Sequence, residues 1–212
     1  MMGWKRRRAS LPGALLVAAV ATPFAPLVAR AQRQAEQGGG GTLRAQPSGR
    51  GRTTVTLVRR AGDPTPARII IDYGQPHARG RPIAGNVVPF DTPWRTGANE
   101  ATSLVTDVDL IMGGVVVPKG SYTLYTLPSR SGWKLIINKD TGQWGTEYRP
   151  EQDLARVELR VRQLREPIDA FSIWLVPDVT RDPSGAITGG LPSGVLRLAW
   201  GEVELTTDWR VR

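Results

Sequence analysis

The chain has 212 residues, a formal net charge of +9 at pH 7, one histidine and no cysteine. The absence of cysteine excludes disulfide bonds, thiol catalysis and lipid attachment at a mature N-terminal cysteine. The one histidine, His77, leaves too few nitrogen and sulfur ligands for a zinc site, and no Gly-x-Ser-x-Gly sequence accompanies it, so we expect neither a metal site nor a serine triad.

The first thirty-one residues have the composition of an export signal. A basic start precedes an uncharged, largely apolar run over residues 11–28, and Ala29-Arg30-Ala31 supplies a small-x-small cleavage sequence. Prolines interrupt the apolar run, and because proline breaks helix interiors, a permanent transmembrane anchor is disfavoured. We therefore expect a cleaved signal peptide over residues 1–31, no stable membrane insertion after cleavage, and a periplasmic or secreted protein.

The high net charge belongs largely to this segment. Its removal lowers the charge from +9 to +4, because it contains no acidic residue and five basic ones: Lys5, Arg6, Arg7, Arg8 and Arg30. In the remaining chain, basic residues alternate with acidic ones, as in residues 156–160, whereas a nucleic-acid-binding protein would carry a basic stripe with interleaved aromatic residues. Nucleic acid is therefore not an expected partner, and the sequence does not specify an oligomeric state.

Residues 32–52 are rich in glycine, glutamine and arginine and have almost no apolar content. Such a composition buries too little apolar surface to offset the entropy lost on ordering. The sequence therefore predicts a flexible leader over residues 32–52, followed by one folded domain over residues 53–212.

From Thr53 onward the sequence alternates between short β patterns and turns. The period-two pattern is clearest over residues 154–164, where apolar and charged residues occupy opposite faces, and Gly113-Gly114 is a hairpin signal. Other strands are predicted at residues 54–58, 68–73, 102–112, 115–117, 121–127, 133–139, 169–176, 194–200 and 202–208. Because no amphipathic helix is evident, we predict an all-β fold, an antiparallel two-sheet β-sandwich or jelly-roll-like single domain.

One segment, Trp94-Arg95-Thr96-Gly97-Ala98-Asn99-Glu100-Ala101-Thr102, combines an aromatic ring, a guanidinium, an amide, a carboxylate and hydroxyls. It ends a long proline-containing connection, and long ordered loops in compact domains are often functional. If Val108 and Leu110 face the core, alternation places Glu100 and Thr102 on the same inward face. A β-bulge near Ala101 would reverse this assignment.

An inward carboxylate needs a partner, and the nearest basic residues are Arg79, Arg81 and Arg95. In a structural interpretation, Glu100 bridges these arginines and Trp94 fills the core. In a functional interpretation, the arginines present surplus donors to a ligand and Trp94 forms its apolar wall. The predicted ligand-binding residues are Arg79, Arg81, Trp94, Arg95, Asn99, Glu100 and Thr102.

Several segments together resemble the bacterial domain-of-unknown-function family 2911. The segments that carry the resemblance are Tyr73-Gly-Gln-Pro76, Arg79-Gly-Arg-Pro-Ile-Ala-Gly85, Val88-Pro-Phe90, Trp94–Thr102, Pro118-Lys-Gly-Ser-Tyr122 and Trp144-Gly145. The resemblance covers residues 53–208 and implies an exported bacterial β domain. The family has no established activity, so the resemblance implies no catalytic residue.

The sequence thus favours a binding module over an enzyme, with a saccharide or an anionic small molecule, such as a carboxylate or phosphate, as the ligand. One alternative is a hydrolase that uses Glu100 as acid or base, which would need a second carboxylate such as Asp72 or Asp91. The other is a purely structural or assembly module. We expect no catalytic residue, no metal and no cofactor.

Overall fold

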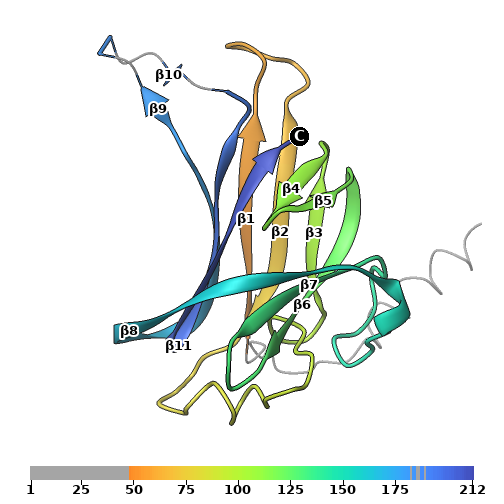
Figure 1. Ribbon diagram of the computed structural model, residues 1–212, viewed down its shortest axis with the longest axis vertical. Coiled ribbons are helices and arrows are strands. Elements are labelled where there is room, and N and C mark those ends of the chain that lie inside the picture. The colour runs from red at the N-terminus through yellow and green to blue at the C-terminus, as the bar shows by residue number, and fades with distance from the viewer. Residues whose placement is uncertain (1–47, 182, 185–186, 189) are drawn as a thin grey trace, which may run out of the picture. The chain divides into compact units, whose positions relative to one another are not determined.

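The computed structural model describes residues 48–181, 183–184, 187–188 and 190–212 (Figure 1). The predicted signal peptide, residues 1–31, and the predicted leader up to residue 47 lie outside this part. The described residues form an all-β, antiparallel fold with one short 3-10 helix and no α-helix, which confirms the predicted fold class. None of the described helical residues belongs to a helix long and apolar enough to cross a membrane.

In the described part of the chain, nine strands form one hydrogen-bonded sheet in the order β1-β2-β3-β6-β7-β8-β11-β4-β5, and two short strands pair separately. The elements are β1 Gly49–Leu57, β2 Ala67–Gln75, β3 Thr102–Thr106, β4 Leu110–Met112, β5 Val115–Val117, β6 Gly120–Pro128, β7 Trp133–Asn138, η1 Pro150–Gln152, β8 Asp153–Pro177, β9 Thr180–Arg181, β10 Ile187–Thr188 and β11 Ser193–Val211.

The predicted division into two separate sheets is not confirmed, because one continuous sheet curls around the core. The edge strand β1 and its neighbour β2 meet the second half of β8 through side chains. The hydroxyl of Thr53 accepts a hydrogen bond from the backbone amide of Leu175 (3.3 Å), and that of Tyr73 accepts one from Ile173 (3.2 Å). No backbone ladder joins β1 to β8 in the described residues, so the sheet stays open. The curl encloses the main core, which includes Leu104, Leu124, Leu135, Ile137, Leu196 and Trp209.

The longest strands, β8 and β11, each join two predicted strands into one. Their pairing shifts register between Ala199 and Gly201 and again between Gly201 and Val203. Gly201 has a φ of 58°, a conformation that residues with a side chain rarely adopt. Register shifts of this kind bend a strand without ending it, so both strands continue through a corner at the lower left of Figure 1.

The predicted strand at residues 102–112 is instead two strands, β3 and β4. Two aspartates end the first pairing and start the second. Asp107 accepts a hydrogen bond from the backbone amide of Arg68 (2.8 Å), and Asp109 accepts one from that of Lys119 (2.8 Å). As a result β3 lies between β2 and β6, whereas β4 lies between β11 and β5.

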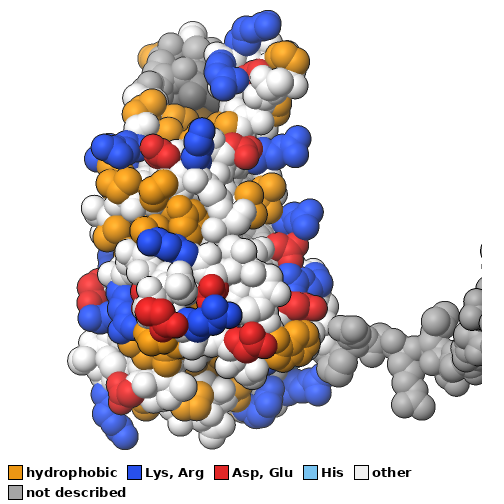
Figure 2. Space-filling view, turned by 90° about the vertical axis from the view of Figure 1, so that its right-hand side faces the viewer, with side chains coloured by type: hydrophobic (Ala, Val, Ile, Leu, Met, Phe, Trp, Pro, Cys, Tyr) orange, Lys and Arg blue, Asp and Glu red, His pale blue; other side chains and the backbone are white. Residues whose placement is uncertain are grey.

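The first strand begins at Gly49, so residues 49–52, assigned to the leader from composition, lie in β1. Their arginines have partners that composition does not reveal. Arg50 and Arg52 both form ion pairs with Asp72 of β2, with Arg52 Nε at 3.0 Å from the carboxylate. On the face shown in Figure 2, basic side chains likewise lie among acidic ones.

Glu204, on β11, has a buried carboxylate. Its side chain is 5 % exposed, and its oxygens accept hydrogen bonds from Arg162 of β8 (2.7 Å) and from Arg197. The Arg197 guanidinium also lies 4.9 Å from the ring centroid of Trp174. The carboxylate is therefore compensated by two guanidiniums.

Glu204→Gln should lower the free energy of unfolding by about 1–2 kcal/mol, because it removes the charge that two arginines share at a buried position. Glu158→Gln is the matched control: its ion pair with Lys134 is exposed, and its loss should change stability by less than about 0.5 kcal/mol. Urea denaturation of both variants measures the difference, and equal effects would contradict the structural role of Glu204.

Candidate functional site

The structure does not gather the seven predicted site residues in one place. Two lie on the loop after β2, two lie in the interior, and three lie next to the loop that precedes η1. These groups are, in that order, Arg79 and Arg81; Trp94 and Thr102; Arg95, Asn99 and Glu100.

The two interior residues contribute to packing. The indole of Trp94 stacks on that of Trp200, with centroids 5.4 Å apart and an angle of 14° between planes, and it meets Phe171 edge-on. Thr102 is completely buried, and its hydroxyl donates to the backbone carbonyl of Thr96 (2.7 Å). Both side chains therefore hold the segment against the core.

The predicted inward orientation of Glu100 is wrong. Alternation does place Thr102, Leu104 and Thr106 in the interior, but the strand begins only at Thr102. Asn99, just before Glu100, has a φ of 63°, which turns the chain out of the strand pattern. The Glu100 side chain is 57 % exposed.

The arginine that pairs with Glu100 is also different from those predicted. Arg50 of β1 donates a hydrogen bond of 2.8 Å to the Glu100 carboxylate, and Arg79, Arg81 and Arg95 do not contact it. Arg50 was assigned to the leader, so its pairing could not be read from the sequence. The expected network of three arginines around one buried glutamate does not exist in the described structure.

The segment from Trp94 to Thr102 is fixed by backbone contacts at two glycines. A Cβ atom at Gly74 would lie 1.9 Å from the carbonyl oxygen of Ala98, and one at Gly145 would lie 1.9 Å from Cδ of Arg95. Thr96, although β-branched, has a φ of 54°. The segment is thus held in a strained conformation by its surroundings, as is common at functional sites.

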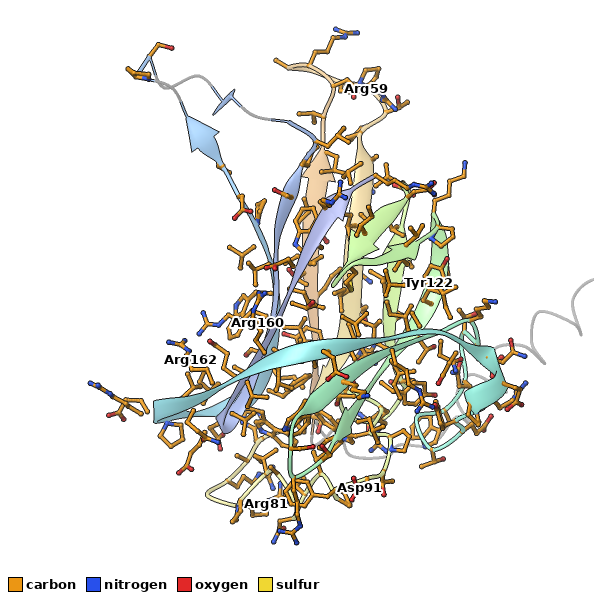
Figure 3. The ribbon with its side chains drawn as sticks, viewed as in Figure 1. Arg59, Arg81, Asp91, Tyr122, Arg160 and Arg162 are labelled. Carbon is orange, nitrogen blue, oxygen red and sulfur yellow. The ribbon has the colours of Figure 1, made fainter. Side chains whose placement is uncertain are left out.

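A cleft of about 540 Å³ lies between the loop after β2 and the corner of β8 and β11. Figure 3 shows Arg81 on this loop, below the strands. The cleft is lined by Ala78, Gly80, Arg81, Pro82, Ile83, Ala84, Gln163, Pro167, Asp169, Gly201, Glu202 and Val203.

Hydrogen bonds hold the loop against the corner. Asp169 of β8 accepts one from the His77 ring (Nδ1 to Oδ2, 2.8 Å) and one from the backbone amide of Arg79 (2.6 Å). Arg81 donates from Nε to the carbonyl of Ala78 (2.9 Å) and from Nη2 to that of His77 (2.8 Å). These bonds fix both the Asp169 carboxylate and the Arg81 guanidinium at the cleft.

The corner approaches the loop closely because Gly201 has no side chain. A Cβ atom there would lie 2.7 Å from Cγ1 of Ile83. On the core side of Ile83 lies the stacked pair of Trp94 and Trp200, which forms the floor under this part of the cleft. The part of the predicted site that contains Arg81 and Trp94 therefore belongs to the surroundings of this cleft.

Three polar residues of the cleft were not predicted: Gln163, Asp169 and Glu202. They come from β8 and β11, more than eighty residues after Arg81. Strand alternation identifies them only as residues of a polar face, so nothing local to them indicates a cleft. Among the described residues, no group of three or more His, Asp or Glu side chains is arranged to hold a metal ion.

The hydrogen bond from the His77 ring, followed by that from the Arg79 amide, lowers the pKa of the Asp169 carboxyl below its ordinary 3.8. Because the pKa is lowered in the folded state, this stabilising contact is complete above the ordinary pKa and is lost as the pH falls through the lowered one. His77→Ala should raise the pKa of Asp169 toward 3.8, as measured by NMR titration of its carboxyl carbon. An unchanged pKa would contradict the role of His77.

Gly74→Ala should lower the free energy of unfolding by more than about 2 kcal/mol, because the added methyl group collides with backbone and cannot be relieved by a side-chain rotation. Gly132→Ala is the control, since nothing lies within 4 Å of a Cβ atom there. Denaturation of both variants in urea compares them. A Gly74 variant as stable as the control would refute the close approach.

Comparison with known proteins places the chain in a family. The family model described as "Protein of unknown function (DUF2911)" matches residues 62–207, more than half of the chain. No curated protein and no solved structure matches the chain. The resemblance inferred from the sequence is therefore confirmed, and the chain belongs to the DUF2911 family.

Proposed function

We propose that the chain is an exported binding protein, with residues 1–31 removed, that holds a saccharide in the cleft between residues 78–84 and the corner of β8 and β11. The observation that carries the proposal is the composition of the cleft. Its polar residues are one arginine, one glutamine and two carboxylates, Arg81, Gln163, Asp169 and Glu202, and they surround Ile83, Val203 and two prolines.

This composition favours a saccharide over an anion. The two carboxylates, Asp169 and Glu202, exceed the one guanidinium of Arg81 among the lining residues, so an anionic ligand would meet net repulsion there. A sugar hydroxyl both donates and accepts hydrogen bonds, and therefore satisfies carboxylate, amide and guanidinium groups alike. The apolar lining residues suit the C–H faces of a sugar ring.

The polar groups are also positioned before a ligand arrives. A guanidinium has five N–H donors, and Arg81 uses two of them on its own loop, which leaves three for a ligand. Asp169 is held by two hydrogen bonds from the loop, while its backbone carbonyl accepts one from the indole of Trp200 (3.0 Å). Such preorganisation reduces the entropy lost on binding.

The geometry gives less support to the two alternatives. Glu100, proposed as the acid or base of a hydrolase, is exposed, forms an ion pair with Arg50 and does not line the cleft. The second carboxylates considered for that hydrolase, Asp72 and Asp91, do not line this cleft either. Of the two carboxyl groups that do, Asp169 is held by His77 and the Arg79 amide, which lower its pKa and so disfavour it as a general acid. A purely structural role accounts for the packing of Trp94 and Thr102. It does not account for the polar side chains that line the cleft.

The test is a thermal-shift and calorimetry screen of the mature domain against neutral sugars: glucose, galactose, mannose, N-acetylglucosamine, cellobiose and maltose. At least one should raise the melting temperature in a saturable manner, because a ligand that binds only the native state stabilises it. Glu202→Gln and Gln163→Ala should each weaken that binding by about tenfold, since each removes a hydrogen-bonding partner at the cleft.

Glu166→Gln is the matched control, because Glu166 is exposed near the same corner but does not line the cleft. It should bind the sugar as the wild type does. The proposal is wrong if no neutral sugar binds, or if binding persists unchanged in both cleft variants.

A further inference from the structure

Only two arginines with described side chains are withdrawn from solvent, Arg95 and Arg197; the others are exposed. Arg197 forms an ion pair with the buried Glu204 and lies over the ring of Trp174. The guanidinium of Arg95 has no ion pair and no hydrogen bond to any described residue, and its Nε atom is fully buried without a partner. A partly buried charge without a partner is costly. Arg95 therefore lacks the counter-charge that the Glu204 carboxylate provides for Arg197.

The surroundings of Arg95 limit how a partner can reach it. Its side chain lies against Gly145, where a Cβ atom would be 1.9 Å from Cδ and 2.9 Å from Nε of Arg95. The carbonyl oxygen of Asn99 lies 2.7 Å from the same point. Because Nε is enclosed in this way, only the two terminal nitrogens of the guanidinium remain to meet a ligand.

The carboxylates nearest to this turn, Glu100 and Asp72, have partners other than Arg95. Glu100, which forms an antiparallel bridge with Trp144 beside Gly145, pairs with Arg50, and Asp72 pairs with Arg50 and Arg52. Glu100 and Asp72 therefore do not supply a counter-charge to Arg95. Glu147, two residues after Gly145, is exposed and forms no ion pair with Arg95 or with any other described residue.

We propose that Arg95 binds the carboxylate group of a small ligand, at a site separate from the saccharide cleft. The two terminal nitrogens of a guanidinium match the two oxygens of a carboxylate in a pair of parallel hydrogen bonds. One carboxylate also supplies the counter-charge that the Arg95 guanidinium lacks among the described residues. A phosphate carries a charge of about −1.5 to −2 at pH 7 and would bring more negative charge beside Glu100 than Arg95 can balance.

The backbone around this site is consistent with a binding role. Thr96 has a φ of 54°, which a β-branched residue rarely adopts, whereas the φ of 63° at Asn99 is one that asparagine tolerates. The turn places the Arg95 side chain against Gly145. The guanidinium is therefore fixed before a ligand arrives, which favours bidentate binding over a transient surface contact.

The experiment measures the melting temperature of the mature domain while sodium chloride is replaced, at constant ionic strength, by sodium acetate, sodium glucuronate or sodium phosphate. Acetate and glucuronate should raise the melting temperature of the wild type and saturate, and phosphate should have a smaller effect. Arg95→Gln should abolish the response to the carboxylates. Arg60→Gln, which removes the same charge from an exposed arginine without a side-chain partner, should leave it intact.

Without a carboxylate, Arg95→Gln should melt at or above the temperature of the wild type, because it breaks no internal ion pair. If that variant does not fold, Arg95→Lys decides: it keeps the charge but loses the planar fork, and should weaken carboxylate binding by about tenfold. The cleft variants Glu202→Gln and Gln163→Ala should respond to carboxylates as the wild type does, so the two sites are tested separately. The inference is overturned if the wild type responds equally to all anions, or to none, or if the response survives loss of the Arg95 guanidinium.

Discussion

The structure depends on the close approach of two backbone segments, at Gly74 and Ala98. A glycine at the end of β2 lets the turn of the Trp94–Thr102 segment lie directly against the sheet, since any side chain at that position would overlap the Ala98 carbonyl. In the segment that this contact holds against the sheet, Trp94 stacks on Trp200 and Arg95 lies against Gly145. A backbone contact of this kind leaves no hydrophobic pattern in the sequence. It is possible only because glycine has no side chain.

Local alternation explains what could be predicted. The strands and the inward face of Thr102, Leu104 and Thr106 follow from a period of two, which needs only neighbouring residues. Alternation fails at Glu100 because Asn99 adopts a positive φ, a property of the turn that the strand pattern does not contain. The sequence likewise indicates a break between strands at Gly201, where the structure has a corner, because a bulge and a turn carry the same glycine signal.

The predicted pairing of a buried carboxylate with guanidiniums is not found at Glu100, but a pairing of this kind occurs at Glu204. Burial of a glutamate requires compensating guanidiniums, and the fold meets this requirement at Glu204 with Arg162 and Arg197. Arg197 and Glu204 are seven residues apart in one strand, too far to touch if β11 were straight. The register shifts at Gly201 bring them together, so the pair depends on a long-range bend that no local pattern indicates.

The two partly buried arginines differ in where their counter-charge comes from. At Arg197 the protein supplies the counter-charge itself, so the interaction is complete when the chain is folded. At Arg95, which is also partly buried, the Nε atom is buried without a partner and the turn holds Thr96 at a positive φ, features that oppose folding. A ligand that contributes a carboxylate would supply, on binding, the stabilising ion pair that Arg95 does not form within the folded domain. The tightly packed segment thus has two roles, since its contacts with Gly74 and Gly145 make the fold rigid and hold the unpaired guanidinium in place.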